Sequence, residues 1–191
     1  MSAYMSAEEV SVVHEFANVL KAMSNLRVHL QTSTENESYV KRFMRWLPKT
    51  YTVRYCRADS RSFRPHYLST ERAFRVTPDN IRSLWPSASP NLKKRVKTAP
   101  VYACVNESGK LVGTSGVGFL NKKSFVISYT ETEPEYRNRG IAKYLTTLAS
   151  EPLIDSGMIG VYSTDVTNEP SLAVARALGF APYCELKCFY N

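Results

Sequence analysis

Three strand-like segments that follow one another with short turns between them constrain the fold more than any other feature of the sequence. Residues 101–105 and 111–120 are largely apolar and flank the segment 106–110, which contains Asn, Ser and Gly, and this pattern predicts a hairpin. Residues 121–123 form a second turn, and residues 124–132 continue as a third strand. The sequence therefore predicts an antiparallel meander.

Helices and single strands are predicted on both sides of this meander. Before it, residues 72–76 predict a strand, and Thr77-Pro78-Asp79 combines an N-cap candidate with proline at the first helical position. This motif predicts a helix over residues 78–85, and a further helical turn is predicted near residues 92–97. After the meander, the pattern predicts a helix, a strand, a helix and an extended segment, from about residue 139 and over 159–163, 171–178 and 180–190.

The first third of the chain has a different pattern. A capping box of Ser and Glu begins a predicted helix over residues 7–28, and a second short helix is predicted over residues 39–47, where a proline ends it. Residues 57–65 form a basic stretch typical of a loop or linker. We therefore expect a helical extension with a basic linker over residues 1–68 and a second domain over residues 69–191.

Cysteine usage and hydropathy exclude disulfide-stapled and membrane-spanning folds. With 191 residues the chain can bury a core without disulfides or metals. The four cysteines include no Cys-x-x-Cys pair, so we expect no metal site and a reducing, cytoplasmic location. No stretch approaches the roughly 18 apolar residues of a membrane helix, and the N-terminal segment lacks the basic start and apolar run of a secretory signal. We therefore expect neither a membrane span nor export.

The net charge of +8 is concentrated in the first half of the chain. Residues 41–97 hold 15 Lys and Arg against 3 Asp and Glu, whereas residues 101–191 hold 8 against 9. Aromatic residues are interleaved with these cations, as in surfaces that meet phosphates and stacked bases. A solvated basic face over an aromatic core has the same composition. A solvated face without a partner is the interpretation that this composition favours, and the alternative is a surface of residues 41–97 that binds RNA or an acidic protein.

The segment 133–145 carries the most chemical information. It reads Glu-Pro-Glu-Tyr-Arg-Asn-Arg-Gly-Ile-Ala-Lys-Tyr-Leu and leads from a strand through a basic loop into a helix. Backbone N–H groups at a helix start have no intrahelical partner and lie at the positive end of the helix dipole. Gly140 lets a ligand approach the backbone, and Ala142 keeps the next turn small. These are the features of a pyrophosphate cradle, and an ordinary basic helix start is the alternative.

Two motifs, together with the order of strands and helices, resemble the GNAT N-acetyltransferase superfamily over about residues 70–190. Arg137-x-x-Gly140-x-Ala142 matches the acyl-CoA pyrophosphate motif of that family. Asn168-x-x-Ser171, followed by Leu178-Gly179-Phe180, matches its second signature. The Gly-x-Gly-x-x-Gly and Gly-Lys-Ser/Thr motifs of other nucleotide-binding folds do not occur.

The resemblance implies an α+β fold with a mixed, mostly antiparallel sheet, flanking helices and a helical N-terminal extension. The fourth and fifth strands, residues 124–132 and 159–163, would splay apart, and acetyl-CoA, the co-substrate, would lie between them. Its pantetheine arm would pair with the fourth strand, and its diphosphate would lie on the N–H groups of the helix start. The residues that the resemblance assigns to acetyl-CoA are Thr132, Glu133, Arg137, Asn138, Arg139, Gly140, Ile141, Ala142, Lys143, Asn168 and Ser171.

Direct attack of an amine on a thioester requires a base for the amine and an acid for the leaving thiolate. Glu131 and Glu133 alternate on one face of the fourth strand, at the mouth of the implied cleft, and are the candidate bases. Alternatively, they are rim charges that pair with Arg137 or Arg139.

The candidate acid marks a departure from the family. Many members place a tyrosine seven residues after the asparagine of the second signature, where this chain has Ala175. Tyr162, at the end of the fifth strand, and Tyr183, after the last helix, are the candidate substitutes. Departure of the thiolate without help and loss of catalysis are the alternatives.

We therefore expect an acetyl-CoA-dependent N-acetyltransferase that acts on a primary amine. The basic first half favours an acceptor carried on an anionic partner, such as an aminoacyl-tRNA or a protein. The alternative is a module that binds nucleic acid or protein on a catalytically degenerate acetyltransferase fold, since a fold does not determine a function.

Overall fold

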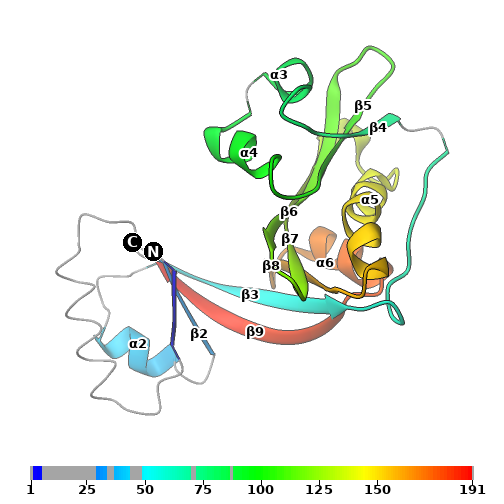
Figure 1. Ribbon diagram of the computed structural model, residues 1–191. Helices are drawn as coiled ribbons and strands as arrows, with labels where there is room; N and C mark the ends of the chain where they lie inside the picture. The colour runs from blue at the N-terminus through cyan, green and yellow to red at the C-terminus, as the bar shows by residue number, and fades with distance from the viewer. Residues whose placement is uncertain are drawn as a thin grey trace. The chain divides into compact units, whose positions relative to one another are not determined.

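The structure, a computed structural model, describes residues 2–5, 29–33, 37–43, 49–69, 72–86 and 88–190 (Figure 1). The described residues form two compact units. The larger unit comprises residues 56–164 and 168–182, and the smaller unit comprises the described residues up to 55 with 165–167 and 183–190. The predicted helix over residues 7–28 lies outside the described residues, and the domain boundary near residue 68 stays a prediction.

The strands of the larger unit lie side by side in the order β8-β7-β6-β5-β4. Their bounds are Arg72–Arg75 for β4, Val101–Val105 for β5, Leu111–Leu120 for β6, Ser124–Thr132 for β7 and Ile159–Asp165 for β8. The neighbouring strands β4, β5, β6 and β7 are antiparallel to one another, whereas β8 runs parallel to β7. The predicted meander is confirmed with its predicted ends, because its turn residues are local in the sequence.

Helices cover both faces of this sheet (Figure 1). The short helices α3 (Ile81–Leu84) and α4 (Pro90–Arg95) pack on Val101 and Ala103 of β5. The long helix α5 (Ile141–Asp155) packs on Cys104 of the same strand. Since successive side chains of a strand point to opposite faces, α4 and α5 lie on opposite sides of the sheet. The last helix, α6 (Glu169–Ala177), shares a core with β7 and β8.

The helix that precedes the meander begins later than the sequence predicted. The prediction placed its start at residue 78, but α3 begins at Ile81. Thr77 and Asn80 close a turn instead: the Thr77 N–H donates to Asn80 Oδ1 (2.8 Å), and the Asn80 N–H donates to Thr77 Oγ1 (3.4 Å). Asn80 Nδ2 also donates to the Arg75 carbonyl (2.9 Å), which holds the turn against β4. The predicted start is therefore wrong by three residues.

The strands of the smaller unit follow the order β1-β2-β9-β3. The bounds in this unit are Ser2–Met5 for β1, His29–Ser33 for β2, Glu37–Phe43 for the helix α2, Lys49–Ala58 for β3 and Ala181–Tyr190 for β9. β1 is parallel to β2, and β2 is antiparallel to β9. Both β3 and β9 also contribute residues to the larger unit.

The sequence predicted neither β1 nor β2. The strand β2 pairs with β9, with Leu30 opposite Phe189, so its partner comes from the far end of the chain. Local patterns do not record such pairing, since strand formation depends on what a segment packs against. Helix α2 confirms the first part of the short helix predicted over residues 39–47, and residues 44–47 lie outside the described residues.

Over the described ranges, no helix has the length and apolar character needed to cross a membrane. Nor do three or more His, Cys, Asp or Glu side chains of these ranges gather in a way that could hold a metal ion.

Candidate active site

The parallel strands β7 and β8 separate part-way along their length. Their pairing ends where Ile127 lies opposite Tyr162, although β7 continues to Thr132. A cleft of about 290 Å³ opens at this separation. It is lined by Ile127, Ser128, Tyr129, Thr130, Glu131, Tyr162, Ser163, Thr164, Asn168 and Ser171. The predicted fourth and fifth strands are β7 and β8, so their predicted splay is confirmed, and this cleft is the candidate active site.

Strand β7 carries a β-bulge where it borders the cleft. Gly116 of β6 pairs with Tyr129 and Val117 pairs with Ile127, which leaves Ser128 as the extra residue. A Cβ atom at Gly116 would overlap the Tyr129 hydroxyl, so a larger residue there would displace that side chain. The bulge and the glycine together place Tyr129 in the cleft wall.

The loop between β7 and α5 passes through the short 3₁₀ helix η2 (Pro134–Tyr136) and turns on two residues with left-handed backbone. Asn138 has a φ of 62° and Gly140 a φ of 83°. A Cβ atom at Gly140 would lie 2.7 Å from His66 Nε2, so glycine suits both the backbone and the space. Gly140 is the N-cap of α5 and offers no side-chain cap, so the first N–H groups of α5 have no acceptor within the helix.

The two arginines of this loop bond to backbone carbonyls. Arg137 Nε donates to the Thr132 carbonyl (3.1 Å), and Arg139 Nη2 donates to the Glu135 carbonyl (3.1 Å). Both bonds tie the loop to itself or to the end of β7, and both guanidinium groups remain exposed. The cations therefore stay close to the start of α5.

Of the two candidate bases, Glu131 lines the cleft, and Glu133 is not among the lining residues. Both side chains are exposed, and the Glu133 N–H donates to the Val112 carbonyl (2.9 Å). The ion pairs of the described residues include neither glutamate. The alternative in which they pair with Arg137 or Arg139 is therefore not what the structure has.

The opposite wall of the cleft is built by β8 and the start of α6. Asn168 caps α6, because its Oδ1 accepts a hydrogen bond from the Ser171 N–H (3.2 Å). The hydroxyl oxygens of Tyr162 and Ser171 lie 3.1 Å apart. Tyr162 is only 2% exposed, because its ring packs against Phe180, yet it lines the cleft together with Ser171. The chain thus holds a tyrosine hydroxyl at the cleft within hydrogen-bond distance of a serine.

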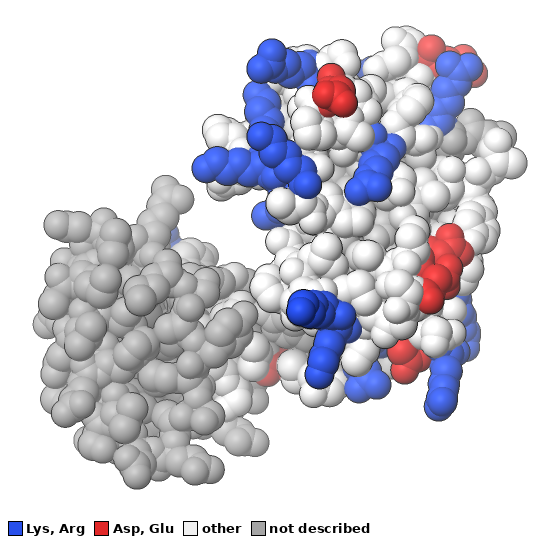
Figure 2. Space-filling view, viewed as in Figure 1, with Lys and Arg blue, Asp and Glu red and all other residues white. Residues whose placement is uncertain are grey.

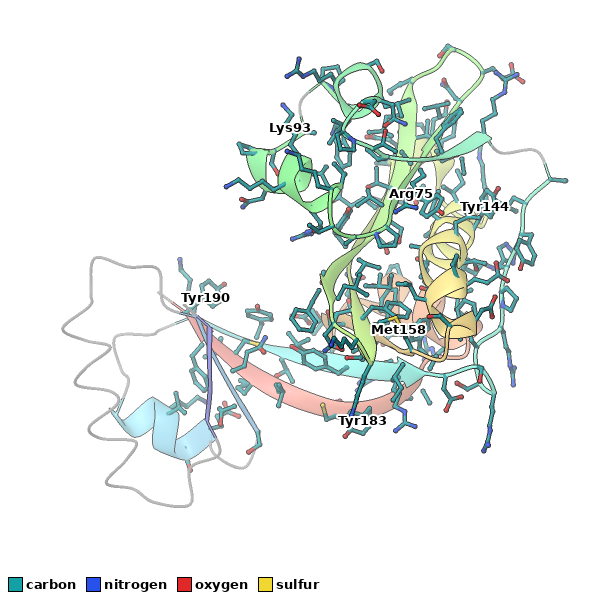
Figure 3. The ribbon with its side chains drawn as sticks, in the orientation of Figure 1. Arg75, Lys93, Tyr144, Met158, Tyr183 and Tyr190 are labelled. Carbon is teal, nitrogen blue, oxygen red and sulfur yellow. The ribbon has the colours of Figure 1, made fainter. Side chains whose placement is uncertain are left out.

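The position at which many GNAT-like sequences carry a tyrosine lies in the core. Ala175 follows Ser171 by one helical turn and is completely buried in the hydrophobic cluster under α6. Tyr183, the second candidate substitute, lies on β9, is 71% exposed and is not among the residues that line the cleft (Figure 3). Tyr162 is thus the candidate acid that lines the cleft within the larger unit, whereas Tyr183 belongs to the smaller unit.

Tyr129 is a cleft residue that the sequence analysis did not select. Its hydroxyl is buried and has no hydrogen-bond partner of good geometry among the described residues, although the Arg95 guanidinium lies 5.4 Å from the ring centroid. Burial raises the pKa of Tyr129 to about 12, against the opposing effect of Arg95, so the hydroxyl is a donor at neutral pH. Its alternation with Glu131 along β7 was the sequence signal that could have found it.

His66 is a second residue whose position the sequence did not reveal. Its Nε2 is buried beside Gly140 without a hydrogen-bond partner among the described residues, while its backbone N–H donates to Thr147 Oγ1 (2.9 Å). Loss of water, and then the nearby charge of Lys143, lowers the pKa of His66. The contact joins two distant parts of the chain, so no local pattern marks it.

The model of the acetyltransferase (GNAT) family matches residues 40–180. The chain belongs to the GNAT acetyltransferase family. The predicted family, the α+β fold class and the assignment to the acyltransferases are thereby confirmed. In this GNAT protein the two signatures lie where the resemblance places them, one at the start of α5 and the other at the start of α6.

Solved structures share this GNAT fold at low sequence identity. A protein assigned to the GNAT acetyltransferases from Novosphingobium aromaticivorans is 15% identical with a TM-score of 0.60, and the match covers 74% of this chain and 64% of that one. A GCN5-related N-acetyltransferase-like protein from Streptococcus suis is 14% identical with a TM-score of 0.66, covering 91% and 75%. A GCN5-related N-acetyltransferase from Kribbella flavida is 10% identical with a TM-score of 0.63, covering 99% and 77%.

The chain thus spans less than two thirds of the length of the Novosphingobium protein. No curated protein matches the sequence significantly. At these identities the likeness to solved structures concerns the fold alone.

Proposed function

We propose that this GNAT protein binds acetyl-CoA between β7 and β8 and transfers its acetyl group to a primary amine by direct attack. The observation that carries the proposal is the end of the β7–β8 pairing just before the uncapped start of α5. Beyond Ile127, the β7 edge that faces β8 pairs with no other strand of the described residues. Such an edge offers hydrogen bonds to the amides of an extended ligand, and the helix start offers N–H groups to phosphates.

The residues at this place suit acetyl-CoA. Thr132 Oγ1, at the end of β7, is buried and has no hydrogen-bond partner among the described residues. Gly140 leaves the start of α5 without a side chain, and the exposed Arg137 and Arg139 flank it. We assign to acetyl-CoA the residues Thr132, Glu133, Arg137, Asn138, Arg139, Gly140, Ile141, Ala142, Lys143, Asn168 and Ser171. When bound, acetyl-CoA supplies an activated acyl thioester.

The residues of the cleft then move the protons. The amine nitrogen bonds to the acetyl carbonyl carbon as the carbon–sulfur bond breaks. Glu131, which lines the cleft without an ion pair among the described residues, accepts the amine proton directly or through water, and Glu133 is the second candidate base. Tyr162, 3.1 Å from Ser171 Oγ, donates a proton to the departing sulfur and recovers one from solvent. Tyr183 remains the second candidate acid.

A second candidate function rests on surface charge. Figure 2 shows Lys and Arg side chains gathered over α3 and α4, within the region 41–97 for which an anionic partner is the alternative interpretation of the sequence. We therefore keep binding of RNA or an acidic protein as the alternative role. It takes the lead if the purified protein binds acetyl-CoA but acetylates no amine.

Calorimetry on Gly140→Asp tests acetyl-CoA binding at the start of α5. Because the substitution adds a side chain and a negative charge to the proposed diphosphate site, we expect the affinity for acetyl-CoA to fall at least about tenfold. Gly157→Asp is the matched control, since Gly157 also has a left-handed φ, of 89°, and no atom lies within 4 Å of a Cβ built there. Both variants carry a similar backbone strain of about 1–2 kcal/mol, and Gly140→Asp in addition displaces the His66 side chain, so their thermal stabilities are compared first.

A folded Gly140→Asp variant that binds acetyl-CoA as tightly as the Gly157→Asp control would remove the ligand from the start of α5. Loss of affinity in both variants would mean that backbone strain alone explains the effect.

A further inference from the structure

Side chains of different charge meet along the β7 wall of the cleft. Tyr129 and Glu131 are two residues apart on β7, and both line the cleft. Residues at this spacing point to the same face of a strand, so the phenol and the carboxylate are neighbours. The guanidinium of Arg95, from α4, lies over the Tyr129 ring, 5.4 Å from its centroid. Tyr129 and Glu131 thus give the wall a neutral donor and a negative group, and Arg95, which is not itself a lining residue, adds a positive group beside the tyrosine ring.

The Tyr129 hydroxyl lacks a partner of good geometry in the described part of the chain. It is buried, and buried polar atoms almost always have a hydrogen-bond partner. Room for it is built into the neighbouring strand, since any Cβ at Gly116 would overlap it. A protonated hydroxyl needs an acceptor, and because it lies over Gly116 of β6, a ligand in the cleft reaches it only when the Tyr129 side chain turns toward the space that this residue lines.

The positive charge beside it is also not neutralised. The helix α4 carries Lys93 and Lys94 in addition to Arg95, and Lys97 follows the helix. None of these cations takes part in an ion pair with another described residue. Residues 72–105 contain seven Lys and Arg against a single acid, Asp79. Figure 2 shows this cationic surface over α3 and α4, and Figure 3 labels Lys93 within it. Such a surface attracts anions and repels cations.

We propose that the acceptor is a primary amine that carries a carboxylate or phosphate close to the amine, with Arg95 and the Tyr129 hydroxyl as the anion-binding pair. The inference rests on the proposed acetyl transfer, in which Glu131 receives the amine proton. A substrate with both groups matches the charges of the wall, its amine at Glu131 and its anion at Arg95. A guanidinium binds a carboxylate or a phosphate through two parallel hydrogen bonds. An amine without an anion leaves the charge of Arg95 without a counter-ion among the described residues and is therefore selected against.

Matched pairs of amines test this inference on the full chain saturated with CoA. Glycine is compared with glycinamide, and phosphoethanolamine with ethanolamine, by calorimetry and thermal unfolding. We expect the anionic member of at least one pair to bind about tenfold or more tightly than its neutral partner, and the pair with the larger difference identifies carboxylate or phosphate as the anion. Equal binding within both pairs overturns the proposal. Tight binding of an aminoacyl RNA minihelix in that case assigns the basic surface to RNA.

Variants of the anion-binding pair provide the second measurement. For the preferred anionic amine, Arg95→Gln and Tyr129→Phe should each raise KM about 10- to 100-fold, or Kd where turnover is not followed. The same variants should change the value for the neutral partner less than about twofold, and Lys93→Gln, on the same helix, is the matched control. An equal loss for both members of a pair would show that these side chains only support the fold.

Failure of the proposed function has a different signature. If the parent chain does not bind acetyl-CoA, acetyl transfer is wrong whatever the amines do. If acetyl-CoA binding is intact and only the preference for anionic amines is missing, the assignment of Arg95 and Tyr129 is wrong and the proposed function stands.

Discussion

The two helices that carry the family signatures, α5 and α6, complete their first turns in different ways. At α6, the Asn168 side chain accepts the Ser171 N–H (3.2 Å), and Glu169 stands in the first turn. At α5, Gly140 provides no side-chain cap, and the first turn contains no acid. Glycine at an N-cap costs only a few tenths of a kcal/mol relative to a capping side chain, so α5 leaves its first N–H groups open at little expense of stability. The comparison teaches that the chain closes the start of α6 by itself and leaves the start of α5 open, where we propose that a ligand anion binds.

The largest effect is expected on kcat, from a change at Tyr162 of β8, beside the capped start of α6. Tyr162→Phe removes the hydroxyl that lies 3.1 Å from Ser171 Oγ and keeps the buried ring. If this hydroxyl protonates the thiolate, kcat should fall about 100-fold while the affinity for acetyl-CoA is unchanged. Steady-state kinetics and calorimetry on the same preparation measure the two quantities. Tyr183→Phe, a change at an exposed residue, is the matched control and should turn over normally.

Two other outcomes would assign the proton differently. A fall in kcat confined to Tyr183→Phe would transfer the role to that residue. Normal turnover in both variants would show that the thiolate leaves without an acid from either tyrosine, which its moderate basicity permits.

A smaller effect is expected on the free energy of unfolding when the side-chain cap of α6 is removed. Asn168→Ala removes the acceptor of the Ser171 N–H, so the free energy of unfolding should fall by about 1 kcal/mol in chemical denaturation of the ligand-free protein. Asn168→Asp keeps an oxygen acceptor at the same position and should preserve the stability. Equal stability of the alanine and aspartate variants would contradict a capping role for this side chain.

The smallest effect is expected on the pH dependence of stability, through His66, which lies beside the uncapped start of α5. Loss of water, and then Lys143, lowers the pKa of His66 in the folded chain from its ordinary 6.5. A lowered folded pKa means that protonation favours the unfolded chain, so the contribution of His66 is complete above pH 6.5 and is lost as the pH falls below it. We expect the free energy of unfolding to decline more steeply on acidification below pH 6.5 in the parent chain than in His66→Gln.

Denaturant unfolding at a series of pH values measures this difference. Parallel curves for the two proteins would contradict it. Asn168→Ala, which changes the other helix start, should keep the pH dependence of the parent.

The strands β5, β6 and β7 could be predicted from the sequence because their turns and apolar runs are local. The two GNAT signatures likewise placed Asn168 and Ser171, and both line the cleft. The strands β1 and β2 could not be predicted, since β2 is a strand by virtue of its pairing with β9. The contact of Arg95 with Tyr129 was equally hidden, because it joins α4 to β7 through packing and follows no motif.

Main-chain groups, unlike side chains, are the same in every sequence. Where β7 parts from β8 after Ile127, the wall proposed for acetyl-CoA consists largely of backbone, and substitutions cannot erase it while the strand keeps its path. This accords with a fold that is shared with solved structures at 10–15% identity. The groups proposed to hold the acceptor are side chains, such as those of Arg95 and Tyr129, which single codon changes can replace. The backbone of this wall is thus insensitive to substitution, whereas its side chains can change and fit new substrates during evolution.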